Sequence, residues 1–333
     1  MLRKLWNDGE KGRQGEVPVA VLLTGATGQV GLFAIPCLVA RNHPVLALSR
    51  RSARAARMQG GLLPGAVHWI HPDALPAMST EVASGGATAG SGQLLDDVEV
   101  LLSCGPVELA TQWAPRCPRL RRVVCISTSS VHTKRASPDA GERKLIGRIC
   151  QAEDRLKSHC RERDIALSLL RPTLIYGCGM DQNVSRLARL IRRFHFLPVA
   201  GKAAGLRQPV HAKDLAQLAV SLAASEAAIS VESAVGGGSV LSYRDMAQRV
   251  FTALGMKPRI LEVSPGLLVL LARCVSWLPY VRGLNAGFVL RQNWDQVFDD
   301  SRLRELTGFR PRPFAPTASD FEVPAEARRW QID

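Results

Sequence analysis

The chain has 333 residues, of which 46% are hydrophobic, so it can bury a sizeable core and intrinsic disorder is not expected. Its 43 Lys and Arg against 29 Asp and Glu give a formal net charge of +14, which favours anionic partners such as nucleotide cofactors, nucleic acid or acidic lipid. The sequence shows no nucleic-acid-binding module, so nucleic acid is not predicted as a partner.

The eight cysteines include no CxxC pair, and several lie in apolar runs, which predicts a reducing, cytoplasmic location. His68 and His71 are three residues apart on an expected strand, where they face opposite sides, so no metal site is predicted. Residues 1–16 lack an apolar stretch long enough for a signal peptide and are expected to form a polar arm.

The first predicted element is a strand over residues 17–24, VPVAVLLT, whose continuous apolar run suits a strand buried on both faces. A helix is expected over about 28–40 and a second strand over 45–49. Further strands are expected at 66–70, 98–104, 122–128 and 166–172. Strands that alternate with helical or loop segments predict an α/β fold with a Rossmann-type, doubly wound parallel sheet.

Two segments depart from this alternation. Residues 79–93 are small and polar, and a flexible surface loop is expected there. Residues 183–196 carry apolar side chains at helical spacing with arginines between them, which predicts an amphipathic helix.

After the polar arm, the predicted organisation is a Rossmann domain over 17–178 and a smaller C-terminal α/β lobe over 179–333, from which about 206–235 returns to the Rossmann sheet.

TGATGQVG, residues 24–31, directly follows the first strand and opens the first helix. Its three glycines let the backbone turn tightly, approach a pyrophosphate and pack the helix on the sheet, while the helix N-terminus offers free amides. Because the motif lies between a buried strand and a helix, it predicts a dinucleotide site rather than an ordinary tight connection. The expected cofactor contacts here are Gly25, Thr27, Gly28, Gln29, Val30 and Gly31.

The second strand is followed by Arg50 and Arg51, where many dinucleotide sites have a carboxylate for the ribose hydroxyls. Guanidinium groups cannot accept those hydrogen bonds, but they bind a 2′-phosphate through paired charge-assisted bonds. The sequence therefore favours NADP(H) over NAD(H), the alternative being that both arginines point into solvent. Asp73, after the third strand, is a further candidate, as a contact for the adenine amino group.

Five motifs in chain order resemble the extended short-chain dehydrogenase/reductase superfamily, which includes the nucleotide-sugar epimerases and dehydratases. They are TGATGQVG, STSSVH, LRPTLIYG at 170–177, RQPVHAKDLA at 207–216 and GGGSVLSYRDM at 236–246. The resemblance implies a domain that carries NAD(P), a lobe over the substrate, and hydride transfer at the nicotinamide. It also implies cofactor contacts at Gly105 and Pro172 and a substrate contact at Arg207, for which a surface ion pair is the alternative.

The superfamily uses a tyrosine as acid/base, a lysine four residues later that lowers the pKa of the tyrosine, and a serine or threonine that orients the substrate. The last of these maps onto Thr128. The stretch GERKLIGRICQAED, residues 141–154, places Leu145 and Ile149 at the tyrosine and lysine positions. The four-residue spacing occurs nowhere else either, because the residues four after the three tyrosines are Met180, Ala247 and Leu284.

Proton transfer would therefore need another group. His132, which follows the strand that delivers Thr128, is the predicted catalytic candidate, and a surface or structural histidine is the alternative. Lys134 and Lys144 are further candidates with suitable chemistry.

Two hypotheses for the function remain open, so enzyme activity is not decided by the sequence. The first is an NADP(H)-dependent oxidoreductase or epimerase that acts on a nucleotide sugar or related polar metabolite through a non-tyrosine acid/base. The second is a non-catalytic NADPH-binding accessory or sensor protein, similar to an accessory-subunit branch of respiratory complex I.

Residues 264–281 are too short and too charged for a membrane span, and they predict either a core helix or peripheral membrane contact. A homodimer is a further possibility that the resemblance raises.

Overall fold

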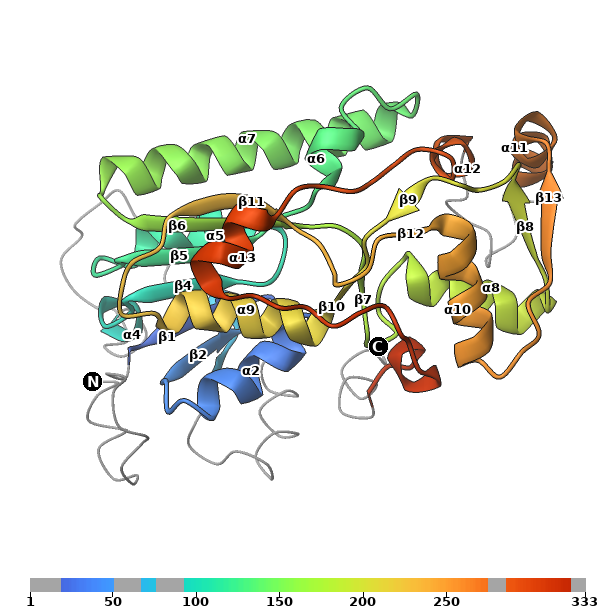
Figure 1. Cartoon of the computed structure of the whole chain (residues 1–333). Helices are drawn as coiled ribbons and strands as arrows, with labels where there is room; N and C mark the ends of the chain where they lie inside the picture. The colour runs from blue at the N-terminus through green and yellow to red at the C-terminus, as the bar shows by residue number, and fades with distance from the viewer. Residues whose placement is uncertain (1–18, 51–66, 76–92, 275–285, 325–333) are drawn as a thin grey trace.

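The structure is a computed structural model that describes residues 19–50, 67–75, 93–274 and 286–324. Its centre is a seven-stranded sheet in the order β11-β6-β5-β4-β1-β2-β3, in which every neighbouring pair is parallel (Figure 1). The strands are β1 (Val21–Thr24), β2 (Val45–Leu48), β3 (Val67–Ile70), β4 (Val100–Ser103), β5 (Arg122–Ile126), β6 (Ala166–Pro172) and β11 (Val231–Val235). The predicted doubly wound parallel sheet is confirmed.

The central strands are continuous apolar runs because both faces of the sheet are covered. All four residues of β1, of β2 and of β4 are buried. The chain order reverses direction between β1 and β4, and parallel sheets bind ligands at the carboxyl edge of such a switch point. The fold therefore places the end of the first strand, and the turn that follows it, at the position where a ligand is expected.

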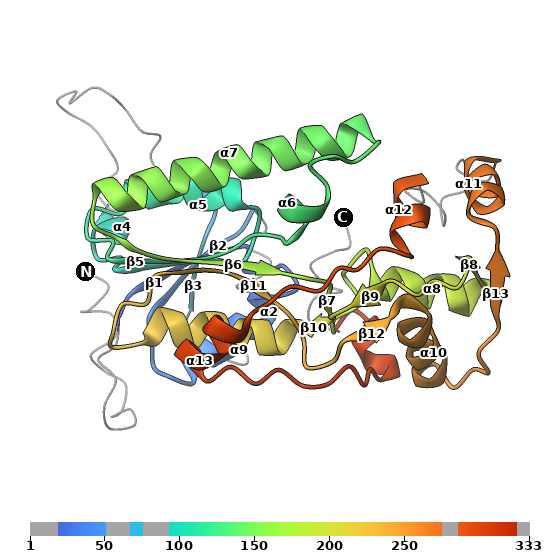
Figure 2. The same ribbon diagram turned by 45° about the horizontal axis from the view of Figure 1, so that its top comes forward.

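Helices form a layer on each face of the sheet (Figure 2). On one face lie α2 (Gly31–Val39), α9 (Ala212–Ala224) and α13 (Ser301–Thr307). On the other face lie α4 (Gln93–Asp96), α5 (Val107–Trp113) and the long α7 (Ala140–Glu162). Short pieces complete this part, namely α6 (Ser130–Thr133), η1 (Pro72–Ala74) and η2 (Ala114–Arg116).

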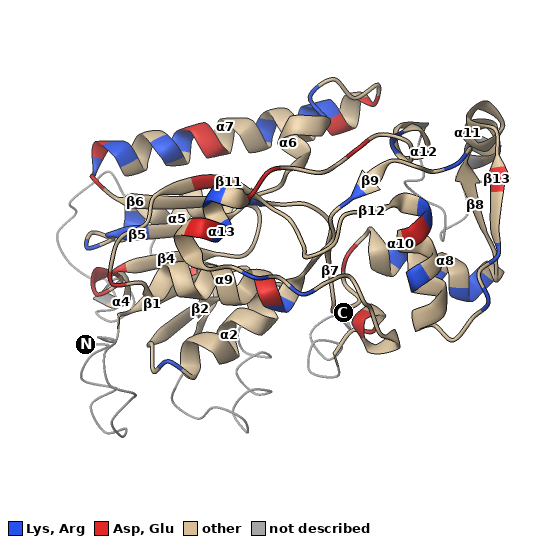
Figure 3. Cartoon of the chain, viewed as in Figure 1, with Lys and Arg blue, Asp and Glu red and all other residues tan. Residues whose placement is uncertain are grey.

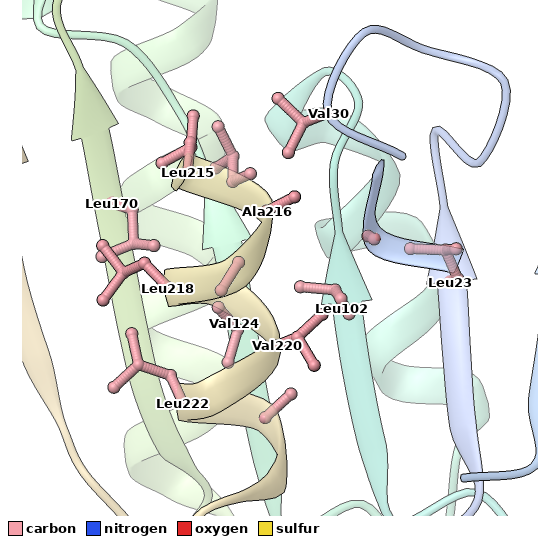
Figure 4. Close-up of a cluster of buried hydrophobic side chains, with 14 of the residues drawn as sticks. Leu23, Val30, Leu102, Val124, Leu170, Leu215, Ala216, Leu218, Val220 and Leu222 are labelled. Atoms are coloured by element: carbon pink, nitrogen blue, oxygen red, sulfur yellow. The ribbon is translucent and has the colours of Figure 1, made fainter. Parts of the chain in front are cut away.

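The helix α9 shows how these layers are held. Leu215, Leu218 and Leu222 project from it toward the sheet, where they meet residues such as Val124 and Leu170 (Figure 4). Each of these side chains is almost fully removed from water. Burial of a leucine stabilises a fold by roughly 1.5–3 kcal/mol, so apolar packing of this kind is the main force that joins helix to sheet.

The second lobe lies beyond the carboxyl edge of the sheet (Figure 1). Its helices are α8 (Val184–Phe194), α10 (Tyr243–Ala253), α11 (Pro265–Cys274) and α12 (Ala286–Arg291), with η4 (Ala318–Phe321) near the end of the chain. Its strands form short pairs from β7 (Ile175–Tyr176), β8 (Leu197–Ala200), β9 (Leu206–Arg207), β10 (Val210–His211), β12 (Leu241–Ser242) and β13 (Ile260–Val263). Figure 3 shows lysines and arginines on helices of both lobes rather than in one cluster.

The amphipathic helix expected after residue 183 is present as α8, which begins at Val184. Part of the segment 264–281 forms α11, which buries Leu268, while Leu267 and Leu270 are about half exposed. None of the helices in the described ranges has the length and apolar character that crossing a bilayer requires. The predicted polar arm, the predicted loop up to residue 92, and residues 275–281 lie outside the described residues.

Candidate functional site

The glycine-rich turn is built so tightly that side chains do not fit at its key positions. Gly25 has a φ of +67°, in the left-handed region that favours glycine, and a Cβ there would lie 2.4 Å from the amide nitrogen of Gly105. A Cβ at Gly31 would lie 2.3 Å from the carbonyl oxygen of Gly25. The turn therefore brings the ends of β1 and β4 together at the switch point of the sheet.

The turn leaves backbone donors at the start of α2. The amide of Gly28 donates to the Gly25 carbonyl at 2.9 Å. Among the described residues, the amides of Gln29, Val30 and Gly31 donate to no backbone carbonyl, and no side chain caps the helix at Val30. Free amides together with the positive end of the helix dipole form a site for phosphate groups.

The other predicted cofactor contacts are placed as follows. Arg50 is exposed directly after β2, and Arg51 lies outside the described residues. Asp73 lies in η1 after β3 with its side chain 90% exposed, 3.5 Å from the ring of His71. Pro172 ends β6, and its carbonyl accepts a hydrogen bond from the Ser129 amide. The structure thus places Arg50, Asp73 and Pro172 at the same edge of the sheet as the turn.

A pocket opens where the carboxyl ends of β5 and β6 face the second lobe. Its wall combines hydroxyl, amide, aromatic and cationic groups from both parts of the chain. The wall includes Thr128, Lys134, Arg207, Tyr243, Arg291 and Gln292.

Thr128, the predicted substrate-orienting residue, lines this pocket. Its Oγ1 accepts a hydrogen bond from the Ser130 amide at 3.2 Å, which leaves the hydroxyl hydrogen available for a ligand. The residue before it, Ser127, holds this loop in place by donating to the Glu153 carboxylate at 2.5 Å. That carboxylate pairs with Arg171 at 2.6 Å. The position of Thr128 is therefore fixed by a buried network of charges.

The helix α7 carries Leu145 and Ile149, the residues expected at the tyrosine and lysine positions. Leu145 is 48% exposed near its start, and Ile149 is partly buried one turn later. Tyr243 is the tyrosine of the pocket wall, but burial raises the pKa of its phenol to about 12, against the opposing effect of nearby arginines. A phenol with that pKa is a poor base at neutral pH.

The predicted proton-transfer candidates are not all brought to the pocket. Lys134 is part of its wall, whereas His132 and Lys144 are exposed and are not. The ring of His132 lies 5.7 Å from that of Phe298, and burial together with the charge of Arg171 lowers the pKa of the imidazole. The catalytic role of His132 stays a prediction.

Arg207, the predicted substrate contact, lines the pocket with only 4% of the residue exposed. Its guanidinium donates to the backbone carbonyls of Leu206, Trp294 and Arg291 at 2.5–2.8 Å. Burial lowers the pKa of Arg207 to about 10. In this structure the residue holds the backbone of the opposite wall of the pocket, an arrangement the sequence did not suggest.

Arg291 and Glu142 are among the residues of the site that were not found from the sequence. Arg291, at the end of α12, forms a bidentate pair with Glu142, in the first turn of α7, with both distances 2.9 Å. Glu142 also accepts hydrogen bonds from Ser137 at 2.6 Å and from Lys134 at 3.2 Å. Burial alone would raise the pKa of Glu142, but these partners lower it to about 2. The sequence could have pointed to Glu142 as a site residue, because it lies one helical turn before Leu145.

Among the described residues, no three His, Cys, Asp or Glu side chains are placed to share a metal ion. His71, one half of the HxxH pair, accepts a hydrogen bond from the Asp73 amide at 3.3 Å.

No protein-family model matches the chain, but individual proteins do. The UDP-glucose 4-epimerase of Vibrio cholerae is 25% identical over 269 residues, and the match covers 72% of this chain and 77% of that protein. Among solved structures, the UDP-N-acetylglucosamine 4-epimerase of Bacillus cereus has a TM-score of 0.61 at 15% identity and covers 95% of this chain and 98% of its own.

The UDP-glucuronic acid 4-epimerase of Bacillus cereus, solved with UDP-glucuronic acid and NAD, has a TM-score of 0.62 at 16% identity. It covers 93% of this chain and 98% of its own. These structural likenesses show the fold, and the sequence match extends over most of it. The chain therefore has the fold of UDP-sugar 4-epimerases and is similar in sequence to one of them over most of its length.

Proposed function

We propose that the chain binds a nicotinamide dinucleotide along the carboxyl edge of the sheet and a nucleotide sugar in the adjoining pocket. The residues of the turn fit such a cofactor, because a Cβ at Gly25 or Gly31 would collide with the backbone and free amides remain at the start of α2. When bound, the nicotinamide supplies hydride transfer to or from a carbon of the substrate. Structural neighbours solved with NAD support this assignment.

The preference for NADP(H) over NAD(H) is part of the proposal. It rests on Arg50, which is exposed directly after β2, and on Arg51, the next residue in the sequence. Guanidinium groups at this strand end suit a 2′-phosphate better than free ribose hydroxyls.

The observation that carries the substrate assignment is the composition of the pocket wall. Arg291 and Lys134 offer positive charge for a diphosphate, while Thr128 and Gln292 offer groups that hydrogen-bond to sugar hydroxyls. Aromatic side chains at Tyr243 and Phe288 complete it, as in many small-molecule sites. Relatives that act on UDP-sugars support a ligand of this class.

In the enzymatic form of the proposal, this chain supplies orientation and proton transfer without a tyrosine base. Thr128 donates its free hydroxyl hydrogen to the substrate oxygen that gains or loses a proton. Lys134 and His132 are the side chains near the pocket and the strand end that carry a transferable proton. The products are a nucleotide sugar inverted or oxidised at one carbon.

A second candidate is favoured by one observation, the apolar pair at Leu145 and Ile149. A chain with these residues binds the cofactor and does not turn it over, as an accessory or sensor protein does. The exposed leucines of α11, including Leu267 and Leu270, would in that case offer a contact surface for a membrane or a partner.

The test compares full-length wild type with Thr128→Val and His132→Ala. Cofactor binding is followed by fluorescence, and conversion of UDP-glucose, UDP-N-acetylglucosamine and UDP-glucuronic acid is followed by chromatography. An epimerase or oxidoreductase loses at least about tenfold in turnover in the Thr128 variant and still binds cofactor. Turnover that is unchanged in both variants contradicts the site assignment, and cofactor binding without turnover in wild type favours the accessory role.

A further inference from the structure

The pair between Glu142 and Arg291 joins the two sides of the pocket. Glu142 belongs to α7, on the Rossmann side, and Arg291 to α12, on the side of the second lobe. In Figures 1 and 2 the start of α7 lies near α12. The hydrogen bonds from Arg291 to Glu142 join the two helices here. Their side chains are 17% and 10% exposed, so the pair is largely shielded from water.

Arg291 lines the pocket while its two terminal nitrogens form a bidentate pair with a carboxylate. A bidentate guanidinium–carboxylate contact has the same geometry as a guanidinium–phosphate contact. Building on the proposed function, we infer that Glu142 acts as a built-in anion: it occupies Arg291 and must be displaced when the diphosphate of a nucleotide sugar binds.

The surroundings of Glu142 make such an exchange feasible. Its carboxylate is also held by Lys134 and by Ser137, at 3.2 Å and 2.6 Å. When Arg291 turns to a phosphate, these two partners remain, so no buried carboxylate is left without a counter-charge or a hydrogen bond. A buried charge that lost every partner would carry a heavy penalty, and this arrangement avoids it.

The surroundings of Arg291 allow its side chain to move while its backbone stays. The Arg291 carbonyl accepts a hydrogen bond from Arg207, and the side-chain amide oxygen of the next residue, Gln292, accepts from the Ala200 amide at 2.8 Å. These contacts fix the end of α12 without engaging the Arg291 guanidinium. The rearrangement is thus confined to one side chain, which exchanges one anion for another.

The inference predicts that Glu142 weakens the binding of anionic ligands. A ligand that must displace an internal competitor has a lower apparent affinity than one that meets a free site. Removal of the carboxylate charge in Glu142→Gln should therefore tighten the binding of phosphate-bearing ligands by about tenfold or more, since charge-assisted hydrogen bonds are the strong ones. A neutral ligand of the same pocket should show no such gain.

The experiment is calorimetric titration of the full-length chain with UDP, with uridine and with inorganic pyrophosphate. The control is Glu108→Gln, which removes one negative charge from an exposed pair with Arg148 and leaves the pocket alone. Glu142→Gln should bind UDP and pyrophosphate about tenfold more tightly than wild type, uridine equally, and Glu108→Gln should match wild type. Arg291→Met should weaken UDP binding, and adding Glu142→Gln to it should restore nothing.

UDP and pyrophosphate binding that is unchanged or weaker in a folded Glu142→Gln protein overturns the inference and makes the pair purely structural. Should that variant not fold, Glu142→Ser decides in the same way, because it also removes the carboxylate that pairs with Arg291. The failure of the proposed function looks different. In that case pyrophosphate binding tightens in Glu142→Gln, whereas UDP and UDP-sugars bind no better than pyrophosphate in any variant.

Discussion

The buried pair of Glu153 and Arg171 supports the loop that carries Thr128. Substitution of Glu153 should lower the stability of the fold by an amount that the burial of this pair determines. The two side chains are 5% and 10% exposed, and the Glu153 carboxylate accepts from Arg171 at 2.6 Å and from Ser127 at 2.5 Å. In Glu153→Ala the Arg171 guanidinium keeps only its contact with Glu232, at 3.1 Å, and Ser127 loses its acceptor.

The magnitude follows from the burial of the pair. Removal of one partner from a buried ion pair costs about 3–5 kcal/mol, because the remaining charge stays in a poorly solvated position. Unfolding entropy of about 2.1 cal/mol/K per residue over 333 residues converts this loss into a fall in the unfolding midpoint of about 4–7 °C. The double change Glu153→Met with Arg171→Met should cost less than Glu153→Ala alone, since no unpaired charge is then buried.

The assay is thermal unfolding of the full-length chain followed by circular dichroism. Glu232→Ala is the matched control, because it also removes a carboxylate from Arg171, but one whose side chain is 43% exposed. That control should cost less than about 1 kcal/mol. Equal losses in Glu153→Ala and Glu232→Ala would mean that burial does not set the cost of removing a carboxylate from Arg171.

Three further predictions concern the cofactor turn and the pocket. Gly31→Ala, whose Cβ would lie 2.3 Å from the Gly25 carbonyl oxygen, should weaken NADPH binding by fluorescence titration at least about tenfold, and Gly28→Ala, at 3.1 Å, should weaken it less. Arg50→Glu should weaken NADPH binding and leave NADH binding nearly unchanged, and equal losses for both would contradict the 2′-phosphate contact. The partners of Glu142 lower its pKa from 4.5 to about 2, so the contacts of its ionised carboxylate should stabilise the fold above pH 4.5. This stabilisation should be lost as the pH falls through about 2. Urea unfolding between pH 6 and pH 2 should therefore depend on pH more steeply in wild type than in Glu142→Gln.

The sheet could be predicted from the sequence because each of its central strands is a short, continuous run of apolar residues. The run at 166–172, for instance, coincides with β6, since a strand buried on both faces must be apolar throughout. The first helix starts at Gly31 rather than at 28, because residues 25–30 form the tight turn. Helix ends depend on such turn geometry, which composition describes poorly.

The pocket could be predicted only in part, because its two sides come from residues far apart in the chain. Thr128 was found from a local motif, and it does line the pocket. Arg291 and Glu142 are in contact although they are 149 residues apart in the sequence, and neither lies in a motif that predicts the contact. Arg207 was predicted as a ligand contact, which stays a prediction, and its hydrogen bonds to three carbonyl oxygens depend on the folded backbone.

The central claim is that this chain binds a nicotinamide dinucleotide and a nucleotide sugar side by side. Its most direct test is a fluorescence titration with NADPH and NADH in the presence and absence of UDP-glucose, followed by a long incubation and product analysis. We expect saturable binding, tighter for NADPH than for NADH, with UDP-glucose bound at the same time. If neither cofactor binds, the glycine-rich turn is not a dinucleotide site and the proposed function is wrong.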